Sequence, residues 1–288
     1  MVFKGMMLLA GIFLTMVSCD QKNDSSDPGK GTVLVRVTDS PFPVSAVSKV
    51  MVTVDKVEIR SVDSLNVDAE NGGFIMLSEK VQEFDILKLR NGLTSDLVQV
   101  EVGIGTYDMI RLHVVSSKVV LKDGTEFNLK IPGGSSSGLK IKLNPELVVE
   151  SGVVNEVLVD FDLSKSFVCL GNHKLPNGIK GFIFKPVVRA MCQKHAGVIE
   201  GLALEDDVTP VTEASVQIYR ADTVFVTAIT DDLGHYKLIG IPAGTYTMSC
   251  TKAGYDSVDV DQVVVKVGEK TMQDFMLTKT DASIVLNP

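Results

Sequence analysis

The sequence predicts an all-β protein built from two antiparallel β-sandwich modules in tandem after a short apolar leader. Val, Ile and Thr recur in short runs separated by Gly, Asn and Asp, and branched side chains pack well on a pleated sheet. The chain has 288 residues, enough for two ordinary domains. Its 45% apolar and 22% charged residues are typical of a globular protein and not of a disordered one.

The first module is expected over residues 31–192, where apolar and polar residues alternate as in half-buried strands. Along residues 50–59 the alternation changes phase, which predicts a β-bulge at residues 55–56. Only residues 79–89 have a pattern compatible with a helix. Strands are predicted at residues 33–37, 50–59, 107–115, 139–143, 157–161 and 182–188.

A module boundary is expected near residues 193–197, and a second sandwich is predicted over residues 197–278. Seven short strands with turn residues between them are typical of a small antiparallel sandwich. They are predicted at residues 198–202, 215–219, 223–229, 235–238, 244–250, 263–267 and 270–277. The tail, residues 279–288, contains an apolar run that either packs on its own module or adds a strand to a neighbouring subunit.

The two modules share a local motif. The motif is Gly-Thr-Tyr, at residues 105–107 and again at residues 244–246. In each module it follows a short segment with apolar residues and begins a predicted strand. Two copies at this long spacing predict related topologies and not a solenoid.

Residues 1–18 form the leader, which carries one charge, Lys4, and an apolar run over residues 6–17. As a helix this run would span about 18 Å, well short of the roughly 30 Å hydrocarbon core of a bilayer. The leader therefore has the length of a signal peptide and not of a membrane span.

The leader ends in Thr15-Met16-Val17-Ser18-Cys19, which resembles a bacterial lipobox, although Met16 stands where Leu is usual. The resemblance implies cleavage before Cys19 and attachment of diacylglycerol to its sulfur, and two or three acyl chains anchor a protein stably. Plain secretion is the alternative. Residues 19–30 would be a flexible tether. The tether also resembles the export signal of Gram-negative surface lipoproteins, which implies the cell surface in place of the periplasmic face of the outer membrane.

The net charge is −8 for the whole chain and −9 after removal of the leader. An acidic protein repels phosphate backbones, so nucleic acid is not expected as a partner. The charge is unevenly spread, because the first module has a net charge of −1 and the second of −8.

Residues 163–199 contain six basic residues and no acidic one. This basic stretch either docks on the acidic second module or meets an anionic ligand such as an acidic glycan, and the alternative is simple solvation of strand faces. Its members are Lys165, Lys174, Lys180, Lys185, Arg189 and Lys194.

The second module resembles the carboxypeptidase regulatory-like domain, a transthyretin-type sandwich of the immunoglobulin-like kind. The resemblance lies in residues 197–201, 214–216, 230–236, 241–246 and 253–255. It implies a folding or spacing module and no peptidase activity. These domains are often grouped with carbohydrate-binding-like sandwiches.

The first module resembles domain of unknown function 4382, found in bacterial lipoproteins. The resemblance lies in residues 37–41, 87–92, 105–112, 138–140, 159–162 and 185–189. It implies no activity.

Catalysis is not expected. Residues 134–138 fit the G-x-S-x-G pattern of a hydrolase elbow, but a strand and not a helix follows, so a flexible loop is the better interpretation. His113, His173, His195 and His235 lack metal-ligand spacing.

No cofactor is expected. Asp160 and Asp162 share a strand face, and Asp231 and Asp232 are adjacent, so both pairs are candidate Ca²⁺ ligands. Neither pair has a loop spacing that would supply six oxygens, and turn capping is the alternative. Cys169 and Cys192 either form a disulfide or are buried as free thiols.

The sequence thus predicts a non-catalytic lipoprotein that binds or presents something at the cell surface. Its partners would be the membrane, through the lipid on Cys19, and a glycan or a surface protein. The alternative is a structural subunit of a surface assembly such as a pilus or an outer-membrane complex.

Overall fold

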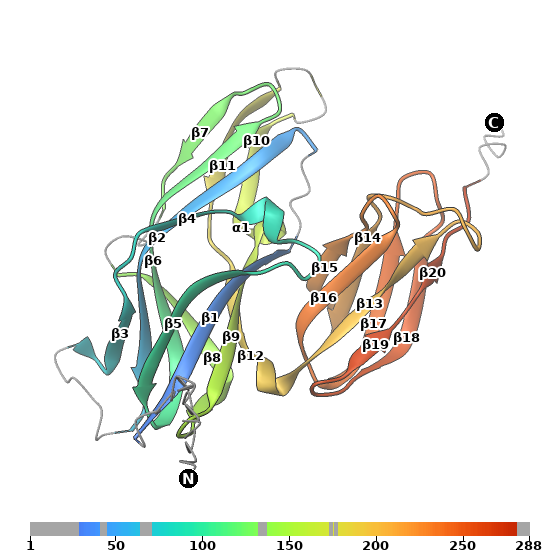
Figure 1. The fold of residues 1–288 in the computed structure, drawn as a ribbon. Coiled ribbons are helices and arrows are strands. Elements are labelled where there is room, and N and C mark those ends of the chain that lie inside the picture. Colours follow the sequence, from blue (N-terminus) through green and yellow to red (C-terminus); the bar gives the residue numbers. More distant parts are fainter. Residues whose placement is uncertain are drawn as a thin grey trace, which may run out of the picture.

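Strands make up almost all of the regular secondary structure in the computed structural model, which describes residues 29–40, 45–63, 71–131, 137–172, 175 and 178–280 (Figure 1). The all-β prediction is confirmed. The leader, Cys19, Lys174, His173, most of the Gly/Ser loop and the apolar tail lie outside the described residues. Among the residues described, no helix is long and apolar enough to cross a membrane.

The first module contains twelve strands within the described residues, with a short helix α1 (Leu163–Ser166) and a 3-10 turn at Ile86–Leu89. The strands are β1 (Lys30–Ser40), β2 (Val47–Ser61), β3 (Phe74–Ser78), β4 (Gln82–Asp85), β5 (Ser95–Gly103), β6 (Gly105–Leu121), β7 (Glu126–Leu129), β8 (Leu139–Val149), β9 (Val154–Asp162), β10 (Phe167–Gly171), β11 (Ile179–Phe184) and β12 (Val188–Cys192).

These strands form two layers around one core. One layer has the order β3-β2-β6-β8 and the other β12-β9-β1-β5, and the single pair Ala190–Leu143 joins them. Most neighbours are antiparallel, whereas β1–β9 and β12–β8 are parallel. Side chains from both layers form one continuous buried cluster, in which Phe161 and Tyr107 are fully enclosed.

The bulge predicted near residues 55–56 is confirmed. The pairing of β2 with β6 shifts register between Val54 and Lys56. Val54 and Val57 are both about 1% exposed, so the extra residue keeps the two halves of the strand facing the core.

Two local predictions in the first module were wrong. Residues 79–89 form β4 and a 3-10 turn in place of a helix, because β4 pairs with β2 and buries Phe84. The strand predicted over residues 182–188 ends at Phe184, since Pro186 cannot donate to a ladder, and β12 begins only at Val188.

The second module consists of two sheets that face each other, with the orders β16-β13-β19 and β15-β14-β17-β18, and β20 also pairs with β13. Its strands are β13 (Ala196–Leu204), β14 (Ser215–Arg220), β15 (Thr223–Ile229), β16 (His235–Pro242), β17 (Gly244–Thr251), β18 (Val258–Val265), β19 (Lys270–Met272) and β20 (Phe275–Met276). The run predicted as one last strand is divided in two at residues 273–274.

The repeated Gly-Thr-Tyr motif has the same geometry in both modules. Tyr107 donates its hydroxyl to the carbonyl of Gly103 at 2.8 Å, and Tyr246 donates to the carbonyl of Pro242 at 2.8 Å. Each ring is buried, and each hydroxyl binds the backbone carbonyl of the residue four positions earlier, across the turn between two strands. The motif therefore closes the turn that opens β6 and β17.

Cys169, Cys192 and Cys250 are free thiols, so the disulfide alternative is not realised. Burial raises the pKa of Cys192 to about 11 and that of Cys250 to about 12. Both thiols are therefore protonated at neutral pH and act as small core residues.

Candidate functional site

A strip of polar side chains follows the outer face of β14 and β17. Alternation along β14 buries Val216 and Ile218 and turns Gln217 and Tyr219 outward. Cross-strand pairing with β17 sets Ser215 beside Thr251, Gln217 beside Ser249, and Tyr219 beside Thr247. The strip is about 13 Å long, since each strand residue adds about 3.3 Å.

Hydrogen bonds order the middle of this polar strip. Ser249 Oγ donates to the Tyr219 hydroxyl at 3.2 Å, and that hydroxyl donates to Gln217 Oε1 at 2.6 Å. Beside them Thr247 donates to Asp261 Oδ1 at 2.7 Å. The phenol is held in one orientation, and its neighbours present hydroxyl, amide and carboxylate groups.

A pocket of about 550 Å³ lies at the Tyr219 end of the strip. Two of its residues, Ala221 and Asp222, form the two-residue hairpin between β14 and β15 with φ of 47° and 60°. Asn and Gly are the usual residues of such a turn, so Ala221 is held in a strained conformation. The other lining residues are Tyr219, Arg220, Thr245, Tyr246, Thr247, Asp259 and Gln262.

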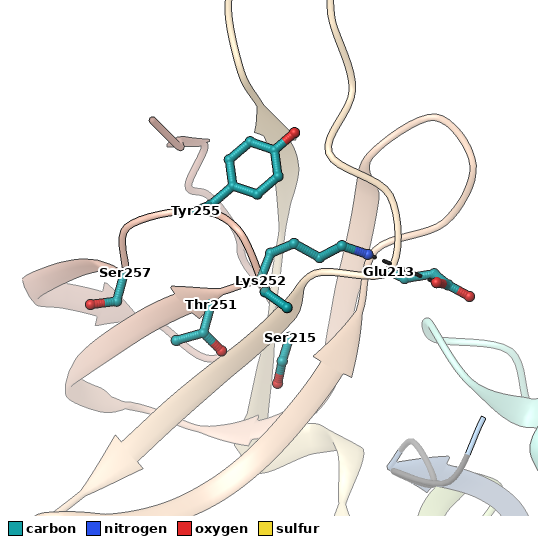
Figure 2. Close-up of a pocket in the computed structure, with 7 residues that line it drawn as sticks. Glu213, Ser215, Thr251, Lys252, Tyr255 and Ser257 are labelled. Atoms are coloured by element: carbon teal, nitrogen blue, oxygen red, sulfur yellow. Dashed lines mark ion pairs between the residues drawn. The ribbon is translucent and has the colours of Figure 1, made fainter. Parts of the chain in front are cut away.

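A second pocket, of about 330 Å³, lies at the opposite end of the strip, where Ser215 and Thr251 lie side by side (Figure 2). Lys252 lies 3.8 Å from Glu213 there, and Tyr255 borders the opening (Figure 2). The strip thus connects two open pockets, each lined by acidic and basic side chains and by at least one tyrosine ring.

The junction between the modules takes up two members of the basic stretch. Arg189 binds Asp160 at 2.7 Å, donates to the Gly240 carbonyl of the second module at 3.3 Å, and lies 4.8 Å above the Phe225 ring. Lys165 binds Asp162 at 2.8 Å and donates to the Val224 carbonyl of β15 at 3.0 Å. These two cations therefore dock the first module on the second.

The other described members of the basic stretch lie elsewhere. Lys194 donates to the Val148 carbonyl of β8 at 2.9 Å, and Lys180 and Lys185 are exposed on or beside β11. The stretch is therefore divided among separate places of the fold.

Two glycines make the junction tight. A Cβ on Gly92 would lie 2.8 Å from Lys237 of the second module, and a Cβ on Gly240 would lie 2.9 Å from Leu158 of the first. Both distances are shorter than a normal carbon contact. Each module thus approaches the other at a position where only glycine fits without a shift.

The candidate Ca²⁺ ligands have other partners. Asp162 caps α1 by accepting from the Lys165 amide at 3.1 Å, and Asp160 binds Arg189. Asp231 accepts from the amides of Leu233 and His235, both at 2.9 Å, whereas Asp232 is exposed. Within the described part of the chain, no group of three or more His, Cys, Asp or Glu side chains is placed to hold a metal ion.

A buried ionic network in the first module was not anticipated from the sequence. Arg111 of β6 binds Glu58 of β2 through two nitrogens, each at 2.5 Å, and its guanidinium lies 3.9 Å from the centre of the Phe74 ring. His113 and Asn71 also reach Glu58, at 2.9 and 3.3 Å. Burial alone would raise the pKa of Glu58, but these hydrogen bonds outweigh it and lower the pKa to about 2.

The family comparisons agree with this two-module architecture. The family described as Domain of unknown function (DUF4382) matches residues 30–186, which is more than half of the chain. The chain belongs to this family. The second module matches the family described as Carboxypeptidase regulatory-like domain, over residues 198–278.

Similarity to solved structures is low throughout. A cohesin–X-dockerin complex of Acetivibrio cellulolyticus is 24% identical over 31% of this chain and 62% of its own, with a TM-score of 0.25. A candidate carbohydrate-binding protein of Bacteroides uniformis is 19% identical over 28% of this chain and 41% of its own length, with a TM-score of 0.25. The minor pilin GBS52 of Streptococcus agalactiae is 11% identical over 88% of this chain and 99% of its own length, with a TM-score of 0.26.

The DUF4382 chain thus spans less than two thirds of the first two of these structures, and none of the three similarities indicates a function. No curated protein is significantly similar to the chain.

The stretches by which the first module resembles DUF4382 converge in space. Asp39, Asn91, Asp160 and Arg189, which come from four of them, line one small cavity at the module junction. Four of the six stretches therefore meet at the junction of the two modules.

Proposed function

We propose that this protein is a non-catalytic lipoprotein, anchored through Cys19 to the outer membrane and exposed at the cell surface, and that it binds a glycan along the polar strip of its second module. The observation that carries the glycan proposal is the strip itself, with an open pocket at each end.

The chemistry of the strip supports a polyhydroxylated ligand. Sugars need several hydrogen-bonding partners of both kinds and a flat apolar surface, and an aromatic ring with a polar edge supplies both. Tyr219 offers its ring, while Thr247 and Gln217 offer hydroxyl and amide groups beside it. Because Tyr219 is already held by Ser249, little side-chain entropy would be lost on binding.

The lipid anchor is tested by metabolic labelling with a radioactive fatty acid in a Gram-negative host. We expect label in the wild-type protein and none in Cys19→Ser, because only a thiol at that position accepts diacylglycerol. Cys169→Ser, which removes a half-buried thiol elsewhere, is the matched control and should label normally. An unlabelled wild type would disprove the anchor.

Glycan binding is tested with the purified full-length protein in detergent on an array of neutral and acidic polysaccharides. We expect Tyr219→Ala to weaken binding at least tenfold, equal to about 1.4 kcal/mol, because it removes the ring that the polar strip itself presents at this pocket. Met272→Ala, at an exposed residue of the opposite sheet, is the control and should bind as the wild type does. If the wild-type protein binds no polysaccharide on the array, the glycan-binding proposal is wrong.

A second candidate function, a structural subunit of a surface assembly, is favoured by the β10–β11 hairpin. Val168, Leu170 and Ile183 lie on one face of this hairpin and are 48%, 41% and 42% exposed. The hairpin lies at the end of its module opposite to the start of β1 (Figure 1). Exposed apolar patches mark protein contacts. Mild cross-linking on intact membranes discriminates, since a subunit yields defined larger species and a solitary binding protein yields only monomer.

A further inference from the structure

A small cavity lies at the junction and is lined by residues of both modules. Its volume is about 10 Å³, enough for one water molecule or one monatomic ion. The first module contributes Thr38, Asp39, Asn91, Gly92, Asp160 and Arg189, and the second contributes Val226, Thr227, Lys237, Leu238 and Ile239.

Oxygen acceptors without donors face this junction cavity. Asp39 is only 7% exposed, and among the described residues neither of its carboxylate oxygens has a hydrogen-bond partner of good geometry. The side-chain oxygen of Asn91 is buried and equally without a donor. Buried acceptors are almost always satisfied in folded proteins, so three such oxygens at one cavity require an occupant.

The nearby donors are committed to other acceptors. Thr38 donates its hydroxyl to the carbonyls of Leu89 and Leu93, both at 2.9 Å. Arg189 is held by Asp160 and Gly240, and Lys237 lies 3.5 Å from Glu200. Within the described residues no side chain therefore donates a hydrogen bond to Asp39, and Arg90 acts on it only through its charge.

The charges around Asp39 favour a cation further. Burial raises the pKa of Asp39 well above its usual value, and the Asp160 and Asp162 carboxylates raise it more, while the Leu163 amide and Arg90 offset only part of this. Since the Arg189–Asp160 and Lys165–Asp162 pairs are each neutral, the negative charge of an ionised Asp39 is offset only in part, by Arg90.

We propose that one hard cation occupies the junction cavity, bound by the Asp39 carboxylate and the side-chain oxygen of Asn91. Carboxylate and amide oxygens are ligands for Ca²⁺ or Na⁺, whereas Mg²⁺ retains several waters for which 10 Å³ leaves no room. The remaining ligands of Ca²⁺ would be backbone carbonyls. Because residues of β15 and β16 close the cavity, the cation would bind tightly only when the modules are docked.

The test uses thermal unfolding of the full-length protein after dialysis against EDTA in a tetramethylammonium buffer. CaCl₂ is then titrated in, and NaCl and KCl are compared at constant ionic strength. We expect a saturable rise of several degrees in the unfolding midpoint with Ca²⁺ or Na⁺, because a ligand that binds only the folded state stabilises it. A smaller effect of K⁺ would reflect the size of the cavity.

Two variants assign the site. Asp39→Asn is expected to unfold in EDTA at or above the wild-type temperature, since it removes a buried charge, and to lose the cation response. Asn91→Gly keeps the backbone conformation, because Asn91 has a φ of 55°, and is expected to raise the half-saturating concentration at least tenfold. Asp207→Asn, at an exposed residue, is the control and should respond as the wild type does.

Two results would overturn the proposal. One is an unchanged cation response in Asp39→Asn. The other is no response in the wild type. A midpoint that also falls as pH rises above 4 would then show that a proton satisfies Asp39, and a flat pH profile would show that a water molecule does. Glycan binding is measured separately on the array, so failure of either proposal leaves the other standing.

Discussion

Replacement of Glu58 by Gln is expected to destabilise the first module by about 3–5 kcal/mol, because it leaves the Arg111 guanidinium buried without its carboxylate. Glu58 is 1% exposed, so water cannot take over that role. The measurement is urea unfolding followed by far-ultraviolet circular dichroism at pH 7. Exposed Glu126 forms an ion pair with half-buried Lys118, and Glu126→Gln should cost less than about 1 kcal/mol. Equal effects of the two substitutions would contradict this account of the network.

The same carboxylate makes stability depend on pH. Its pKa is about 2 in the folded chain against an ordinary 4.5, so the folded state binds fewer protons than the unfolded state between these values. The stabilisation, about 3 kcal/mol, is complete above pH 4.5 and is lost as pH falls from 4.5 toward 2. Glu58→Gln should therefore flatten the acid limb of the stability curve.

Replacement of Gly201 by Ala is expected to destabilise the second module by at least about 3 kcal/mol. A Cβ at Gly201 would lie 1.8 Å from the carbonyl oxygen of Gln273, which is backbone and cannot rotate away. That carbonyl also accepts the buried Tyr236 hydroxyl at 2.5 Å, so moving it breaks a second contact. Calorimetry should show a lower unfolding temperature for this module.

Gly244→Ala is the matched control for Gly201→Ala. Its Cβ would meet only the Tyr246 ring, at 3.4 Å or more, which is ordinary van der Waals contact. It should change stability by less than about 1 kcal/mol. A comparable loss in both variants would mean that the glycines matter through the unfolded chain and not through close packing.

The sequence was most informative where structure is local. In the second module Gly and Asp mark each turn, and the strand predicted at residues 223–229 has the same bounds as β15. The bulge in β2 was predictable because the apolar alternation changes phase there. Only an extra, unpaired residue keeps both halves of such a strand facing the core. Residues 79–89 were misjudged because β4 depends on pairing with β2, whose partner residues lie 28 to 34 positions earlier in the chain.

The ionic network could be foreseen only in part. Arg111 and His113 share a strand face, which the spacing of two shows. Their partner Glu58 comes from a strand more than fifty residues earlier, and only the register between β2 and β6 brings it opposite them. Pairing between distant strands leaves no mark at either position alone.

The junction was the least predictable part of the candidate sites. The basic stretch suggested docking on the second module, but nothing in its composition separates Arg189 and Lys165, which dock, from Lys194, which does not. The strip on β14 and β17 was also missed. Gln217 and Tyr219 look like ordinary outward residues until pairing sets Ser249 and Thr247 beside them.

The modules are connected by a single 3-10 turn, Gln193–His195, between β12 and β13. Gly92 and Gly240 each lie in close contact with the other module, and Arg189 and Lys165 donate hydrogen bonds across the junction. Because the modules are fixed to each other in this way, the connection does not act as a hinge. A load applied to the second sandwich would therefore pass to the first without bending at this connection.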